Sequence, residues 1–111
     1  MQLHFVKKDG ALIVRVTGEL DHHSAVEIRE RTDDRVVSEN VKLLIFDFSS
    51  LAFMDSSGIG VVIGRYKLMK SLGGNICIIS SNKAVDKMLE LSGIVKLIPV
   101  CETVDEAVKL A

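Results

Sequence analysis

The sequence predicts an α/β domain with an N-terminal hairpin followed by alternating β and α units. Short apolar runs of β type alternate with stretches whose apolar residues recur at helical spacing, and glycines or capping residues separate them. Successive parallel strands joined by helices require a central sheet with right-handed crossovers. We therefore expect one domain, residues 1–111, with a mixed sheet of about four to five strands flanked by about four helices.

The N-terminal third is predicted to be a hairpin followed by a surface helix. Two β-like runs, 3–6 and 12–16, flank the turn sequence 8–10. The pattern breaks over 17–21, and residues 24–27 then have capping-box spacing, which predicts a helix start. The apolar side of this helix is formed by residues at helical spacing: Ala25, Ile28, Thr32 and Val36.

The middle of the chain predicts a strand, a helix and a second strand. Residues 41–48 are nearly all apolar, as in a strand that is covered on both faces. Apolar residues recur at helical spacing from about Ser56 to Ser71, and Gly73-Gly74 is typical of a helix C-terminus. A second buried strand is expected over 76–80.

The C-terminal third predicts two helices and an edge strand. A helix around 84–89 ends at Gly93, and a short strand follows over 95–100. Pro99 favours an edge position for this strand, because proline cannot donate to a ladder hydrogen bond. A second capping box at 103–106 predicts a last helix that runs to the end of the sequence.

The composition gives no support to binding of nucleic acid or to a membrane protein. Of the 111 residues, 48% are hydrophobic and 26% are charged, which supports a buried core and a charged surface. The 14 basic and 15 acidic residues give a net charge of −1, so nothing favours a nucleic acid or an anionic membrane as partner. No apolar run approaches the length of a membrane span.

The two cysteines, Cys77 and Cys101, both lie in hydrophobic surroundings. This setting predicts small buried thiols rather than a disulfide. The opening residues Met1–His4 do not resemble a signal peptide. We therefore expect a reduced protein in the cytosol.

Residues 53–60 lie where an apolar strand ends and a helix begins, which makes them the main functional candidate. Asp55, Ser56 and Ser57 fall at the helix N-terminus, where one capping residue suffices. At least one of these side chains is then free and exposed. A hydroxyl here suits a phosphate, because backbone N–H groups and the helix dipole favour added negative charge.

A second polar segment, Asp21-His22-His23, is expected to be an exposed loop before the first helix. Loops at the C-terminal ends of parallel strands lie side by side, so this segment is expected to neighbour Asp55 and Ser56. The two histidines do not predict a metal site, because adjacent side chains point in different directions and no further ligand has suitable spacing.

Gly58, Gly60 and Gly64 invite a comparison with dinucleotide-binding loops, which they do not fit. The third glycine comes one residue late for the GxGxxG pattern, and the apolar periodicity places these glycines inside the helix. No lysine follows as in a phosphate-binding loop. Close packing of the helix on the sheet is the expected role of Gly60 and Gly64.

A small serine hydrolase is the alternative that the residues leave open, with Ser56 or Ser57 as nucleophile and His23 as base. The strand-to-helix setting suits a nucleophile elbow, but the first glycine of GxSxG is missing. An interaction domain without phosphorylation is a further reading. The residues alone do not choose between Ser56 and Ser57 in any of these roles.

Four segments carry a family resemblance: Thr17–His23, Phe53–Gly60, Gly64–Lys67 and Leu91–Gly93. Together they resemble the anti-sigma factor antagonist family, the STAS-domain proteins, and within it the members that act in sporulation. The resemblance spans essentially the whole chain and has the element order expected above. Ile59, where leucine is more usual, is a mild departure.

This resemblance implies a regulatory switch rather than an enzyme, with no cofactor. In the family, the first serine after the motif aspartate, here Ser56, is phosphorylated by an anti-sigma factor that is also an ATP-binding, dimeric serine kinase. The unphosphorylated protein binds that kinase and releases the sigma factor, and a PP2C-type phosphatase restores the antagonist. It further implies a cytoplasmic protein that binds neither nucleic acid nor membrane. The implied docking surface consists of Asp21, His22, His23, Asp55, Ser57, Gly58 and Gly60.

Overall fold

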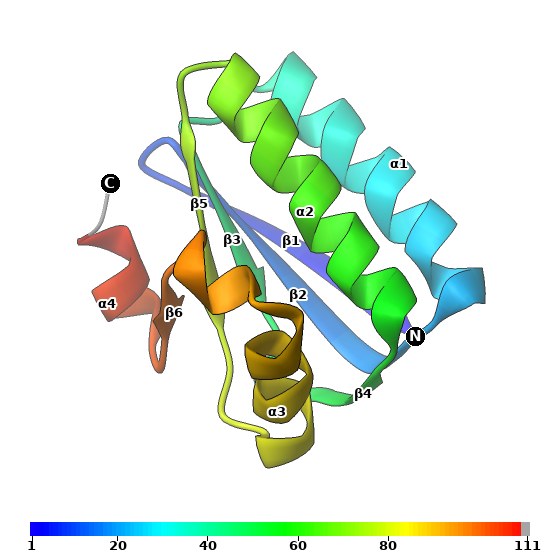
Figure 1. Cartoon of the computed structure of the whole chain (residues 1–111). Helices are drawn as coiled ribbons and strands as arrows, with labels where there is room; N and C mark the ends of the chain where they lie inside the picture. Colours follow the sequence, from blue (N-terminus) through cyan, green and yellow to red (C-terminus); the bar gives the residue numbers. More distant parts are fainter. Residues whose placement is uncertain (110–111) are drawn as a thin grey trace.

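The computed structural model describes residues 1–109, which form a six-stranded mixed sheet with helices on both faces (Figure 1). The strands lie in the order β1-β2-β3-β5-β6, and β4 pairs with β2 beside this path. β1 is antiparallel to β2, and the other pairs are parallel. In chain order the elements are β1 (Gln2–Lys8), β2 (Ala11–Leu20), α1 (His22–Ser38), β3 (Leu43–Asp47), β4 (Leu51–Met54), α2 (Ser56–Ser71), β5 (Asn75–Ile79), α3 (Lys83–Ser92), the 3₁₀ turn η1 (Ile94–Lys96), β6 (Val100–Cys101) and α4 (Val104–Val108).

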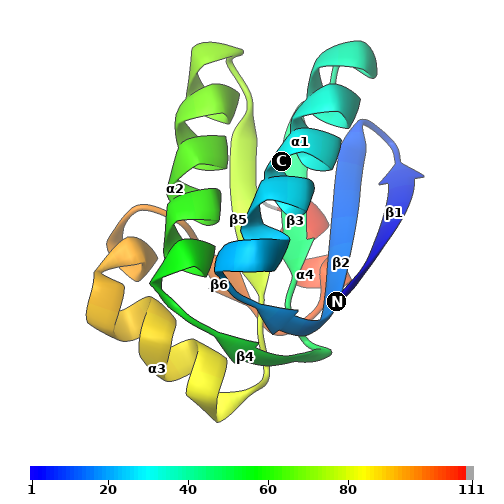
Figure 2. The same ribbon diagram turned by 90° about the vertical axis from the view of Figure 1, so that its right-hand side faces the viewer.

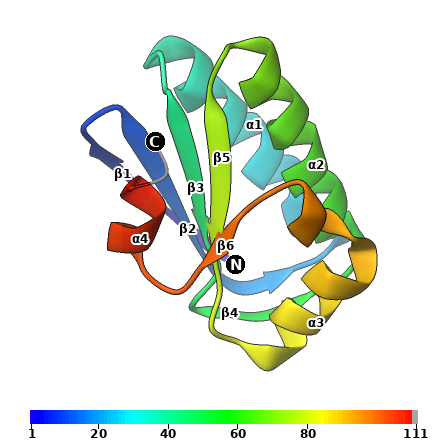
Figure 3. The same ribbon diagram turned by 60° about the vertical axis from the view of Figure 1, so that its left-hand side comes forward.

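Each face of the sheet has its own core. Helices α1 and α2 run side by side over one face, with α3 below them, and α4 lies on the other face (Figures 2 and 3). Successive residues of β3 alternate between the two: Leu44 and Phe46 join the larger core, whereas Leu43 and Ile45 join the smaller core under α4. All residues of β3 are buried, which confirms the predicted strand with two covered faces.

β2 is longer than predicted and changes its parallel partner along its length. Residues 11–15 pair with β3, and residues 18–20 pair with β4. The register shifts between Gly18 and Glu19, and Gly18 has a φ of 89°. The predicted break over 17–21 is therefore wrong, because glycine lets the strand bend and continue to Leu20 instead of ending there.

β4 was not predicted, so the sheet has more strands than expected. Its burial pattern runs buried, exposed, exposed, buried, and such a short segment without alternation leaves no strand signature. The strand expected over 95–100 is also wrong for most of its length. Residues 94–96 form the 3₁₀ turn η1, and strand β6 consists of Val100 and Cys101, which pair with β5.

The other helix predictions agree well with the structure. α2 spans the predicted residues. α3 ends at Gly93, whose φ of 80° lies in the left-handed region that favours glycine. Thr103 caps α4 by accepting a hydrogen bond from the Glu106 N–H at 3.2 Å. The predicted continuation of this last helix to Ala111 falls on residues 110–111, which lie outside the described residues.

Both cysteines are free thiols, as predicted. Cys77 is buried, and this burial raises its pKa to about 12. Cys101 is only half-buried, so the predicted burial is correct for Cys77 and wrong for Cys101, although partial burial raises the pKa of Cys101 as well. Across residues 1–109, none of the helices combines the length and apolar character that a membrane crossing needs.

Candidate functional site

The N-termini of α1 and α2 lie side by side at one end of the sheet (Figure 2). Leu20, at the end of β2, pairs with Met54, at the end of β4, and the Asp55 N–H donates to the Leu20 carbonyl oxygen at 3.2 Å. One residue further along each chain segment, Asp21 and Asp55 cap the two helices. The predicted proximity of the two polar segments is confirmed, and the parallel pairing of β2 with β4 is its cause.

Asp21 forms a reciprocal capping box with Ser24. Its Oδ1 accepts from the Ser24 N–H at 3.0 Å, and its own N–H donates to Ser24 Oγ at 2.9 Å. The predicted box over 24–27 is therefore wrong. His22 and His23 belong to the exposed first turn of α1 rather than to a loop. The backbone N–H of Ser24 holds the pKa of Asp21 below its ordinary value.

Asp55 caps α2 and leaves Ser56 free. The Asp55 Oδ1 accepts from the Ser57 N–H at 2.8 Å, so the cap uses the Ser57 backbone. Ser57 is half-buried, whereas Ser56 is exposed as the first residue of the helix. Within residues 1–109 the Ser56 hydroxyl makes no hydrogen bond. The structure thus separates two serines that the sequence could not distinguish.

Gly58 is the glycine that packing requires at this helix start. A Cβ atom on it would lie 2.5 Å from Met54 Cγ and 3.2 Å from Leu20 Cδ2. At Gly60 and Gly64 a Cβ would meet nothing within 4 Å, so the predicted close packing is wrong for both. Gly60 is exposed and leaves open space on the surface of α2.

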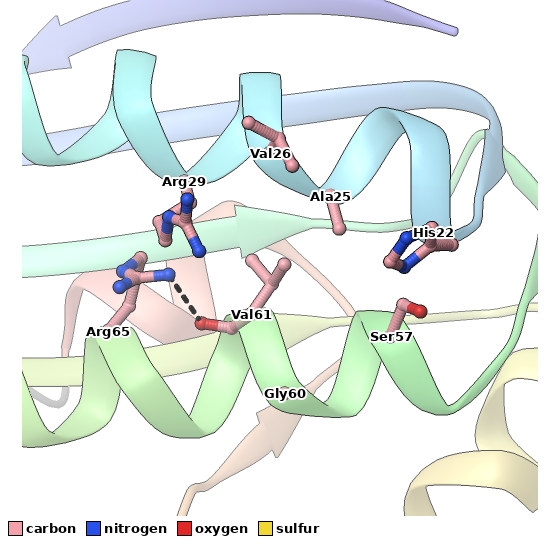
Figure 4. A pocket seen from close by; sticks show the side chains of 8 residues that line it. All are labelled: His22, Ala25, Val26, Arg29, Ser57, Gly60, Val61 and Arg65. Carbon is pink, nitrogen blue, oxygen red and sulfur yellow. Dashed lines mark hydrogen bonds between the residues drawn. The ribbon is translucent and has the colours of Figure 1, made fainter.

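A groove of about 410 Å³ runs between α1 and α2, away from this end of the sheet (Figure 4). At its near end His22 lies opposite Ser57, and at its far end Arg29 lies opposite Arg65. Gly60 also lines it. The groove therefore begins at Ser57, the residue after Ser56, and continues along both helices.

The hydrolase alternative finds no support in this arrangement. His23 lines a different hollow, beside Met1 and Glu19, and not the groove that Ser57 lines. No hydrogen bond joins Ser56 or Ser57 to a histidine anywhere in the described part of the chain, as a nucleophile and its base would require. Among residues 1–109, no group of three or more His, Cys, Asp or Glu side chains could hold a metal ion.

Sequence reasoning named three residues of the groove as site residues and missed the other five: Ala25, Val26, Arg29, Val61 and Arg65. Arg29 follows His22 by seven residues, and Arg65 follows Ser57 by eight, so each pair lies on one side of its helix. A helical projection that starts from the capping residue of each helix would therefore have predicted the positions of Arg29 and Arg65. Such a projection could not have predicted the parallel packing of α1 on α2, which brings the two arginines together.

Comparison with known proteins places these observations in a family. The model of the STAS domain matches residues 2–107. The chain is 37% identical over 100 residues to the anti-sigma F factor antagonist of Paenibacillus polymyxa, which covers 90% of this chain and 86% of that protein.

Two solved structures of the anti-sigma factor antagonist SpoIIAA have the same fold. The unphosphorylated form superposes with a TM-score of 0.85 at 29% identity, covering 96% of this chain and 93% of that one. The phosphorylated form, from Bacillus, has a TM-score of 0.76 at 28% identity, and the match covers 97% of each chain. The predicted α/β architecture is thereby confirmed.

Proposed function

We propose, on the premise that this chain belongs to the STAS-domain family, that it is an anti-sigma factor antagonist switched by phosphorylation of Ser56. The observation that carries this proposal is the exposed hydroxyl of Ser56 at the first position of α2, which forms no hydrogen bond with any of residues 1–109. Solved structures of SpoIIAA, at 28–29% identity, include an unphosphorylated and a phosphorylated form, which supports a phosphate-dependent switch in this chain.

In this proposal the whole chain, residues 1–111, is one STAS domain and acts as a binding protein, not as an enzyme. The unphosphorylated form binds an anti-sigma factor that is also an ATP-binding, dimeric serine kinase, and the sigma factor is released. Phosphorylation of Ser56 ends this binding, and a PP2C-type phosphatase restores it. The 37% identity to an anti-sigma F factor antagonist supports a role in sporulation, in the cytoplasm.

A phosphate on Ser56 is compatible with the fold. It would lie at the N-terminus of α2, where unpaired backbone N–H groups and the helix dipole favour negative charge by about 0.3–1 kcal/mol. Since Ser56 is exposed, the added group would displace no packed side chain. The effect of the phosphate therefore falls on the partner rather than on this chain.

The partner would have to bury the phosphate at the interface. Burial of an unpaired dianion has a desolvation penalty of several kcal/mol. The whole binding free energy of a micromolar complex is only about 8 kcal/mol, so this penalty removes a large part of it. Phosphorylation is thus sufficient to abolish a contact centred on Ser56. The docking surface that we propose around it combines Asp21, His22, His23, Asp55, Ser57 and Gly60, while buried Gly58 holds the helix start in place.

Phosphate transfer by the cognate anti-sigma factor kinase tests the proposal. The chain is incubated with the kinase and ATP, and the modified residue is mapped by mass spectrometry. We expect phosphate on Ser56 both in the wild type and in Ser57→Ala, and no transfer to Ser56→Ala. Phosphate on another residue, or none, would overturn the assignment.

A further inference from the structure

The groove between α1 and α2 ends in two guanidinium groups that the proposed switch does not use. Arg29 on α1 and Arg65 on α2 face one another across it (Figure 4). The Arg65 residue is 8% exposed. Its Nε lies 2.8 Å from Asp33 Oδ1, and its Nη1 donates to the Val61 carbonyl oxygen at 3.2 Å.

Among the described residues, two guanidinium groups and no carboxylate line this end of the groove. Asp33 forms its ion pair with Arg65, whereas Arg29 forms no ion pair within residues 1–109 and acts on Asp33 only through its charge. Burial lowers the pKa of Arg65, and the charge of Arg29 lowers it further against the opposing effect of Asp33. A second carboxylate between the two arginines would relieve this repulsion.

The walls between the two ends of the groove are apolar and open. Ala25, Val26 and Val61 line them, and Val26 is 44% exposed. Gly60 adds no side chain, so an approaching chain could reach the backbone of α2. Seven residues of helix separate His22 from Arg29, which corresponds to about 10 Å along the groove.

We propose that the anti-sigma factor that docks on Ser56 extends a segment along this groove and places a carboxylate between Arg29 and Arg65. This inference rests on the proposed function, because Ser57, the residue that follows Ser56 in the first turn of α2, lines the groove. A carboxylate suits the site, since guanidinium groups bind it through paired, charge-assisted hydrogen bonds. The apolar walls favour a polypeptide segment over a small free anion.

Arg29→Gln tests the proposal, because it removes the unpaired charge and leaves the Arg65–Asp33 pair intact. We expect the unphosphorylated variant to bind the anti-sigma factor roughly five- to tenfold more weakly, with a shallower salt dependence of affinity. The matched control is Arg31→Gln. Arg31 lies on another side of α1, where it pairs with Glu27 and covers the Phe5 ring, so its loss should leave the affinity unchanged.

The outcomes separate this inference from the proposed function. If wild type and Arg29→Gln bind the anti-sigma factor with equal affinity and Ser56 is still phosphorylated, the proposal of a partner carboxylate in the groove is wrong. The proposal of a phosphorylation switch at Ser56 would be unaffected. A wild-type chain that does not bind the kinase would overturn both. A third experiment titrates the free chain with inorganic phosphate or ADP. If either ligand binds and Arg29→Gln abolishes this binding, the groove is a site for a free anion, and the proposal of a partner carboxylate is wrong.

Discussion

Arg65 and Asp33 form an ion pair between α2 and α1, with Arg65 Nε 2.8 Å from Asp33 Oδ1. The Arg65 side chain is 9% exposed and that of Asp33 is 34% exposed. A guanidinium taken out of water needs a counter-charge nearby, because the desolvation of an unpaired ion is unfavourable. The pair therefore restrains the spacing of the two helices whose N-termini carry Asp21 and Asp55.

Asp33→Ala should lower the free energy of unfolding by about 1–2 kcal/mol, because it leaves the buried guanidinium without a counter-charge. The exposure of Asp33 keeps this below the full penalty for a buried pair. Urea unfolding measures the change. The double variant Asp33→Ala/Arg65→Met is the control and should be no less stable than Asp33→Ala alone. If Asp33→Ala is as stable as the wild type, solvent already screens the charge of the Arg65 guanidinium.

Gly58→Ala should destabilise the protein by about 1–3 kcal/mol, because its Cβ would lie 2.5 Å from Met54 Cγ. Gly60→Ala is the matched control on the same helix. Its Cβ would meet nothing, so the gain in helix propensity, up to about 1 kcal/mol, should appear as increased stability. Thermal unfolding of both variants measures the difference. Equal melting temperatures would show that Met54 moves aside at little energetic expense.

Ser56→Ala should bind the anti-sigma factor as well as the wild type, whereas Ser56→Asp should bind it at least tenfold more weakly. The reason is that a carboxylate at this exposed position must be desolvated on docking. Both variants should fold normally, because an acidic residue in the first turn of a helix is favourable. Calorimetric titration measures the affinities. If the two variants bind equally well, charge at Ser56 is not the switch.

Much of the fold was predictable because its strands and helices have strong local periodicity. The nearly continuous apolar sequence of β3 indicated a strand buried on both faces, and the spacing from Ser56 to Ser71 gave α2 its correct bounds. β4 escaped prediction because its pairing with β2 depends on the register shift at Gly18, which only the assembled sheet reveals. Local pattern also misplaced the start of α1, since Asp21 and Ser24 are both good caps.

The candidate site was predictable in its residues but not in its geometry. The sequence indicated that Asp55, Ser56 and Ser57 lie at a helix N-terminus, yet their exposure depends on how α2 packs. The Asp55 carboxylate takes the Ser57 N–H, which leaves the Ser56 hydroxyl in solvent. The arginines of the groove come from positions that look like ordinary charged residues on an exposed helix face, so only the packing of α1 against α2 gives them a shared role.

The capping contact of Asp21 predicts a specific loss of stability in acid. The Ser24 N–H lowers the pKa of this carboxyl in the folded chain, so its ionised form stabilises the fold at pH values above its ordinary pKa of about 3.9. That contribution is lost as the pH falls through the folded-state pKa. Asp21→Asn keeps a capping oxygen but cannot titrate.

The difference in free energy of unfolding between wild type and Asp21→Asn should therefore be constant above about pH 5 and should shift in favour of the variant below about pH 4. Urea unfolding at a series of pH values measures it. Asp9→Asn, in the turn between β1 and β2, is the matched control, because Asp9 accepts no such capping hydrogen bond and asparagine also tolerates its φ of 49°. If the difference in free energy of unfolding between wild type and Asp21→Asn does not change with pH, the hydrogen bond from the Ser24 N–H to Asp21 is not retained in solution. Another residue would then cap α1.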